Sequence, residues 1–160
     1  RTHDSLCRGI SNLLRFASEH VVVIDAYGWT TEAINQMQHF IKEISCDRLN
    51  SKLPTVTLFF KESGKSASSN HVKQQILLDA NFRKLDIKIE VIVLEEILGS
   101  DVFHNRCILT EHGGVLIGHG IGVSGVSAHT DEIVLMNSTL YQKKWKQFME
   151  GGFFKFISQA

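Results

Sequence analysis

The sequence has few cysteines, no long apolar run and no excess of charge of either sign. Its three cysteines, Cys7, Cys46 and Cys107, are scattered and odd in number, which favours reduced thiols and a cytoplasmic setting over a disulfide-stabilised secreted protein. No apolar segment is as long as a membrane span, and no signal peptide is recognisable. Lys+Arg and Asp+Glu both total 17, which argues against binding nucleic acid mainly through overall charge, although a local basic site remains compatible with it.

The chain also lacks internal repeats, and its 160 residues suit one domain with a substantial core. An apolar fraction of 43% and a charged fraction of 21% are typical of an ordinary globular protein. Because the sequence starts at Arg1 and not at Met, we expect residues 1–160 to be one domain of a longer multidomain protein, whose other domains would be its partners.

Helical and strand patterns alternate along the chain and predict an α/β fold, with a mixed sheet flanked by helices on both faces. Val21–Ile24 is a continuous β-branched run of the kind that is buried on both faces of a sheet. Tail aromatics at Phe153–Phe156 suggest docking on this domain or on a partner. The predicted helices cover Asp4–Ala17, about Thr31–Ile44, Asn70 to about Leu85, and a last helix capped by Asn137 or Ser138; the further predicted strands are Thr55–Phe60, Ile87–Val93, Val102–Thr110, Val115–His119 and Glu132–Met136.

Chemistry-bearing residues concentrate in Val102–Gly125. The period-two alternation of Val102–Thr110 is that of a strand, which puts His104 and Arg106 on the same face, roughly 6–7 Å apart. A nucleophile or general acid beside a fixed cation suits a phosphate site. The alternative is a strand carrying two half-exposed polar side chains and no function.

The order and spacing of these residues resemble the phospholipase D superfamily, whose motif is H-x-K, four residues, D, six residues, G-S. This sequence has His104-Asn105-Arg106, four residues, Glu111, six residues, and Gly118-His119. The spacing matches, while Arg replaces Lys, Glu replaces Asp and His replaces Ser. The chain looks most similar to the H-x-R branch and to the phospholipase D-like domain that follows the MIT domain, with Asp25-Ala26-Tyr27 at the position of that domain's D-P-Y motif.

The resemblance implies a single-motif phospholipase D-like domain with a phosphate site. His104 would attack phosphorus as the nucleophile, Arg106 would clamp the phosphate oxygens, and Glu111 would orient a histidine. Two further sets of candidates follow: the phosphate-binding residues Gly118, His119 and Gly120, and the supporting residues Asn105, Asp25 and Tyr27. For Asp25 and Tyr27 a simple helix-entry turn is the alternative interpretation. We predict no cofactor and no metal, since no ligand spacing typical of a metal site occurs.

Two functions stay open at this level. A one-motif enzyme would need a homodimer to complete its active site, and it would be a nuclease-like, metal-independent phosphodiesterase. The three departures from the motif instead favour a non-catalytic module that binds phosphate, in nucleic acid or a phosphoinositide, or that dimerises.

Overall fold

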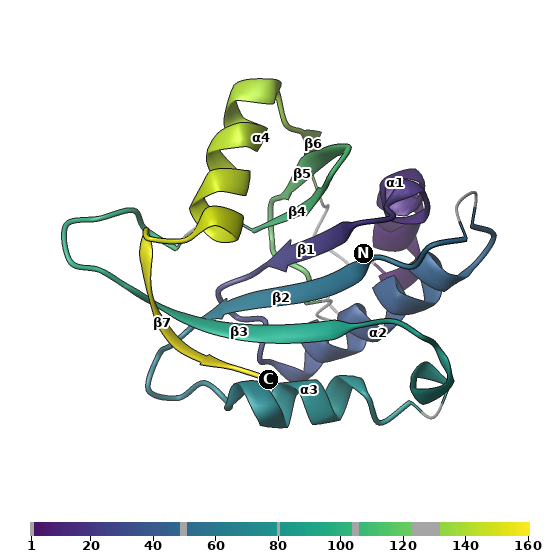
Figure 1. Ribbon diagram of the computed structural model, residues 1–160, viewed down its shortest axis with the longest axis horizontal. Coiled ribbons are helices and arrows are strands. Elements are labelled where there is room, and N and C mark those ends of the chain that lie inside the picture. The colour runs from purple at the N-terminus through teal and green to yellow at the C-terminus, as the bar shows by residue number, and fades with distance from the viewer. Residues whose placement is uncertain (1, 49–50, 80, 104–105, 123–131) are drawn as a thin grey trace.

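Strand β1, His20–Ile24, lies near the centre of a seven-stranded sheet with the order β6-β5-β4-β1-β2-β3-β7 (Figure 1). The structure is a computed structural model that describes residues 2–48, 51–79, 81–103, 106–122 and 132–160. Strands β1, β2 and β3 run parallel to one another, and every other pairing in the sheet is antiparallel. The other strands are β2 Thr55–Lys61, β3 Ile89–Glu96, β4 Cys107–Thr110, β5 Gly113–Ile117, β6 Ile133–Leu135 and β7 Phe154–Gln159.

Helices cover both faces of the sheet, which confirms the predicted α/β architecture. Three helices, α1 His3–Phe16, α2 Thr31–Ser45 and α3 Ser69–Ile76, pack on one face. The other face carries α4 Ser138–Trp145, which continues into a π-helical turn, Lys146–Glu150. Figure 1 shows α4 on its own, away from the other three helices. None of the helices in the described residues is long and apolar enough to cross a membrane.

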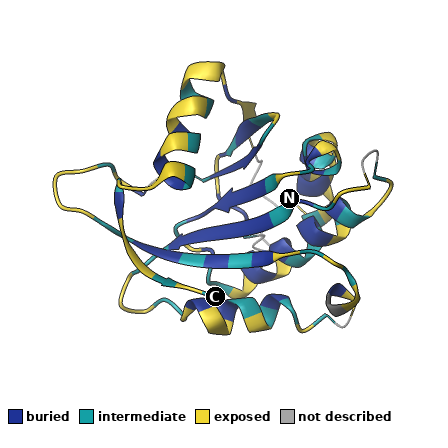
Figure 2. Cartoon of the chain, viewed as in Figure 1, coloured by how far each residue is buried: buried dark blue, intermediate teal, exposed yellow. Residues whose placement is uncertain are grey.

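The apolar patterning explains why these segments adopt these positions. Val21–Ile24 are fully buried because each face of β1 meets a separate core, and Figure 2 shows the central strands as buried. Helix α2 begins where the Thr30 hydroxyl accepts a hydrogen bond from the Ala33 N–H at 3.3 Å, and its Met37, Phe40 and Ile41 enter the core.

Two predicted elements are much shorter in the structure. The helix expected from Asn70 to about Leu85 is α3, which is capped by Ser68 and ends at Ile76. A short-range turn diverts the chain, since the Asp79 carboxylate accepts the Asn81 N–H at 3.0 Å. The strand expected from Val102 begins only at Cys107, and the Phe103 N–H donates to the side-chain carboxylate of Glu96 at 2.7 Å.

The aromatic tail forms a strand that the sequence did not predict. Phe154–Gln159 is β7, and it pairs antiparallel with β3 at the edge of the sheet. Of the two alternatives for the tail, docking on this domain or on a partner, the structure shows the first.

Candidate functional site

The pairing of β1 with β4 brings two of the predicted site residues together. Asp25 directly follows β1, and Arg106 directly precedes β4. Ile24 pairs with Cys107 in the antiparallel register. Asp25 and Arg106 therefore lie side by side where the central strands β1 and β4 meet at one end of the sheet. The parallel strands β1 and β2 have their carboxyl ends at this end of the sheet. Ligand sites in open α/β sheets usually lie at the carboxyl ends of the strands.

Asp25 is a buried carboxylate that links three segments. Only 2% of its surface is exposed. One carboxylate oxygen, Oδ1, accepts the Tyr27 N–H at 2.9 Å and lies 3.8 Å from Arg106 Nε. The other oxygen, Oδ2, accepts the Ile121 N–H at 2.7 Å. Two backbone donors and a neighbouring cation offset the loss of hydration that burial imposes on this carboxylate.

Arg106 is positioned from two sides. Its guanidinium carbon lies 5.6 Å from the centre of the Tyr27 ring, in a cation–π contact, while Nε faces Asp25. The Arg106 side chain remains 29% exposed. Two contacts therefore fix the direction of the guanidinium group, and part of it is still accessible to a ligand.

Gly120 fits against both members of this pair. A Cβ atom at this position would lie 2.6 Å from Asp25 Oδ2 and 2.9 Å from Arg106 Cδ, and the backbone φ is +82°. Only glycine combines that conformation with so close an approach. Gly120 and Ile121 thus cover the Asp25–Arg106 pair closely.

Arg106 and Tyr27 border a hollow of about 620 Å³. Its polar lining comes from Lys61, Ser63, Arg106 and Glu132, so two cations face one carboxylate. Lys61 also forms a 2.8 Å ion pair with Glu96, which lies outside the lining. Apolar walls complete the hollow, and they include Phe103, Ile117 and Val134.

Lys61, Ser63 and Glu132 did not emerge from the sequence as site residues. The sequence did contain a signal for Lys61. Lys61 ends β2 just as Asp25 follows β1, and neighbouring parallel strands have their carboxyl ends at the same end of the sheet. The Lys61 N–H donates to the Ala26 carbonyl at 3.4 Å, which joins the two strand ends. Glu132 had no comparable signal, since its position depends on how β6 pairs with β5.

Comparison with known proteins assigns no family. No family model matches the chain, and no curated protein matches it. Among solved structures, one similar chain is described as TrmBL2, an archaeal chromatin protein that "shows a novel mode of DNA binding". The two share 11% identity with a TM-score of 0.47, over 94% of this chain and 50% of that one. The chain thus spans half the length of that protein, and a similarity this low supports no inference about function.

Apart from Glu111, the remaining predicted residues fall into three groups. Gly118 lines the hollow, but its N–H already donates to the Glu132 carbonyl at 3.1 Å. His119 is exposed and is not part of the lining. His104 and Asn105 lie outside the described residues, so their predicted roles rest on the sequence.

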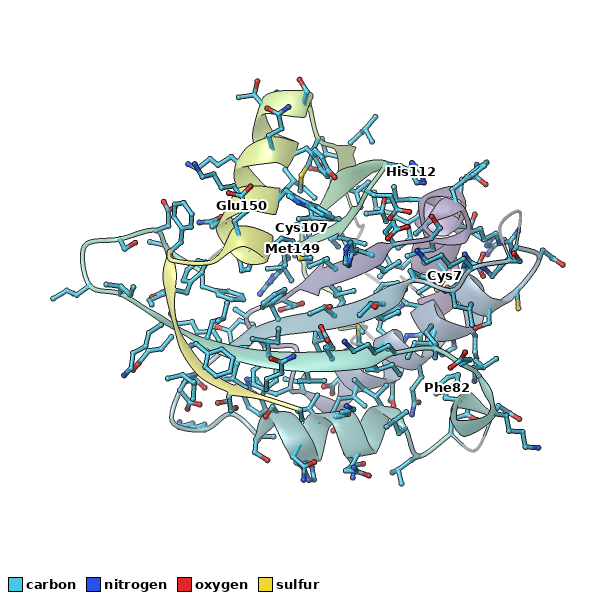
Figure 3. All side chains as sticks on the ribbon, viewed as in Figure 1. Cys7, Phe82, Cys107, His112, Met149 and Glu150 are labelled. Atoms are coloured by element: carbon cyan, nitrogen blue, oxygen red, sulfur yellow. The ribbon has the colours of Figure 1, made fainter. Side chains whose placement is uncertain are left out.

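Glu111 lies at the opposite end of β4 from Arg106, five positions along a strand, or roughly 17 Å away. The Glu111 carboxylate accepts the N–H groups of Glu19 at 3.0 Å and His20 at 3.1 Å, as well as that of Ser18. Burial alone would raise the pKa of Glu111, but these backbone donors outweigh it and lower the pKa to about 2. His112, which Figure 3 shows beside α1, lies in the turn between β4 and β5 at this end of β4. Glu111 therefore joins β4 to the α1–β1 connection and does not contact the Asp25–Arg106 pair.

The part of the chain that the structure describes contains no group of three or more His, Cys, Asp or Glu side chains arranged to hold a metal ion. Its three cysteines are free thiols, and Cys107 is buried on β4 beneath α4 (Figure 3). Burial raises the pKa of the Cys107 thiol to about 12, so this thiol is protonated at neutral pH. The hollow itself offers a positioned guanidinium group, a lysine, a hydroxyl group and the Glu132 carboxylate.

Proposed function

We propose that this chain is a phosphodiester-handling domain of the phospholipase D type, with Arg106 as its phosphate ligand. The observation that carries the proposal is the Arg106 guanidinium, which a buried carboxylate and an aromatic ring direct at the border of a hollow. A guanidinium group meets two phosphate oxygens at once, and its fixed direction reduces the entropy lost on binding. Lys61 and Ser63 add a second cation and a hydroxyl donor.

Nucleic acid is the phosphodiester that we favour, in a cytoplasmic setting that agrees with the three free thiols. Binding at this site does not require turnover, so a phosphate-binding module is the minimal form of the proposal. Glu111 takes no part in it, because its carboxylate is occupied by backbone donors at the other end of β4.

A nuclease-like enzyme is the second candidate, and the sequence favours it because His104 precedes Arg106 by two positions. Two such sites in a homodimer would supply two copies of His104. One imidazole would attack phosphorus while the bond from phosphorus to the leaving oxygen breaks, and the second would give that oxygen its proton. Water would then attack phosphorus, the phosphorus–nitrogen bond would break, and the proton of water would return to the second imidazole.

Binding and cleavage are tested together with labelled DNA and RNA in the absence of added metal. The proteins are the wild type, Arg106→Met, His104→Ala and a matched control, Lys155→Met, which alters an exposed lysine on β7. We expect Arg106→Met to lose binding at least tenfold, as expected for a lost charged contact, and Lys155→Met to bind as the wild type does.

The His104→Ala protein separates the two candidates. Cleavage by the wild type that disappears in this variant would support the enzyme, whereas binding without cleavage in a folded dimer would leave the binding module. Equal binding by the wild type and Arg106→Met would contradict the proposal itself.

A further inference from the structure

We propose that the ligand of the hollow is a single-stranded nucleic acid, and that one of its unpaired bases stacks on Tyr27 beside the phosphate held by Arg106. This inference rests on the proposed function and goes further, because it assigns the class of nucleic acid and a residue that selects it.

Tyr27 is an aromatic side chain that the fold leaves open. Its exposure is 55%, although it lies directly after a fully buried strand. Its backbone is fixed by the N–H donated to Asp25, and the ring lies in the lining of the hollow. The Arg106 guanidinium lies over the Tyr27 ring, so the aromatic ring and the cation form one continuous surface. Stacking of a base on such a surface requires little rearrangement.

The hollow combines a polar side with an apolar side. Lys61 and Arg106 supply charge, whereas Phe103, Ile117 and Val134 supply apolar walls. A phosphate group alone would contact only the charged side chains. A nucleotide uses both, because it joins an anionic group to a flat, largely apolar ring. The volume of about 620 Å³ lies within the roughly 300–1,000 Å³ of pockets that take small ligands, which accommodates a nucleotide but not a duplex.

Charge argues against duplex binding in the same way. Duplex binding depends on many phosphate contacts made by a basic surface. This hollow is lined by two cations and the Glu132 carboxylate, and the chain as a whole has a net charge of zero. Stacking therefore has to supply the affinity that charge does not, and a base within a duplex is unavailable for stacking on a protein ring.

The experiment compares three nucleic acids of equal length by fluorescence anisotropy: a single strand, its duplex and an abasic single strand with the same backbone. The fourth ligand, vesicles containing a phosphoinositide, is tested by co-sedimentation. All proteins carry His104→Ala, so that no ligand is consumed. In this background we compare Tyr27→Leu, which removes the ring, Tyr27→Phe, which keeps it, and Phe156→Leu, a control with a similarly exposed aromatic residue on β7 (59%).

We expect Tyr27→Leu to weaken binding of the single strand about five- to 100-fold and to leave binding of the abasic strand unchanged. Tyr27→Phe and Phe156→Leu should bind the single strand as the parent protein does. If the abasic strand or the duplex bound as tightly as the single strand, the inference would be overturned while phosphodiester binding at Arg106 remained intact. Preferential binding of the vesicles would overturn the inference in favour of a lipid headgroup. Failure of a folded protein to bind any of the four ligands would overturn the proposed function as well.

Discussion

Asp25 is the residue that joins the segments beside the hollow. Its carboxylate contacts the β1–α2 turn through the Tyr27 N–H, the segment after β5 through the Ile121 N–H, and β4 through Arg106. Three stretches that are far apart in the sequence therefore meet at one buried side chain. The partly exposed Arg106 side chain obtains its direction from that buried contact.

Gly120→Ala tests how closely the covering segment fits this pair. A methyl group would lie 2.6 Å from Asp25 Oδ2, on a backbone with φ +82°. Gly64→Ala is the matched control, since its φ is +67° but nothing lies within 4 Å of the added Cβ. Both variants carry a backbone strain of about 1–2 kcal/mol, and we expect Gly120→Ala to be further destabilised in urea unfolding and to lose phosphate binding. Equal free energies of unfolding with intact binding would show that the segment yields without disturbing Arg106.

Glu111 gives the stability a defined pH dependence. Its pKa falls from an ordinary value of 4.5 to about 2 in the folded protein, because its backbone donors outweigh burial. A depressed carboxylate pKa stabilises the fold above pH 4.5, and this contribution is lost as the pH falls through about 2. This contribution amounts to at most about 3.5 kcal/mol. We expect Glu111→Gln to unfold more readily than the wild type at pH 7 and to approach it at pH 2–3, measured by urea unfolding across that range; a constant difference at every pH would refute this role.

At the scale of elements, the sequence predicts those segments whose own side chains decide their structure. The continuous run Val21–Ile24 and the capped, amphipathic α2 both occur where the patterns place them. Strand β7 escaped prediction because it is an edge strand whose pairing with β3 shifts register between Val93 and Leu94, which breaks the period-two pattern. Similarly, Glu96 diverts the chain at Phe103 through a side-chain contact that local propensity does not reveal.

In the candidate site, too, some residues could be predicted from the sequence and others depend on strand pairing. Motif spacing pointed to Arg106, and the wider resemblance pointed to Asp25, Tyr27 and Gly120. Each of these lies at the end of an element or in a turn that the sequence marks. Lys61 and Glu132 are brought in by strand pairing across the sheet. The spacing also included Glu111, but motif spacing does not indicate which end of a strand a residue faces.

Arg48 joins the ends of two helices, and its removal tests that connection. Its guanidinium group donates to the Ile44 carbonyl at 2.8 Å and the Ala17 carbonyl at 2.6 Å. Hydrogen bonds to charged groups contribute about 1.5–3 kcal/mol each, so we expect Arg48→Met to lower the free energy of unfolding by about 2 kcal/mol or more. Lys155→Met, which breaks an ion pair whose lysine is 65% exposed, should change it by less than about 0.5 kcal/mol. Similar losses for both variants in urea unfolding would contradict this account of Arg48.

For the whole molecule, the balance of charge is the property that most limits function. The chain has 17 basic and 17 acidic residues, so any affinity for nucleic acid has to be local. Two cations at the hollow predict a shallow salt dependence, with log K falling against log salt with a slope of about −1.4 for a single strand, since each neutralised phosphate contributes about −0.7. We expect Arg106→Met to halve this slope in titrations at several salt concentrations. A slope steeper than about −4 would indicate a second basic surface.

The central claim, that Arg106 is the phosphate ligand, is tested most directly by the ¹H–¹⁵N spectrum of the arginine Nε–H groups during titration with inorganic phosphate and then with a dinucleotide. The Arg106 signal is identified by its absence in Arg106→Lys, and Arg48, whose guanidinium donates to backbone carbonyls, is the internal reference. We predict that the Arg106 signal moves and saturates with both ligands while the Arg48 signal stays in place. An Arg106 signal that does not move while the dinucleotide binds would show that the phosphate is held elsewhere, and would contradict the account.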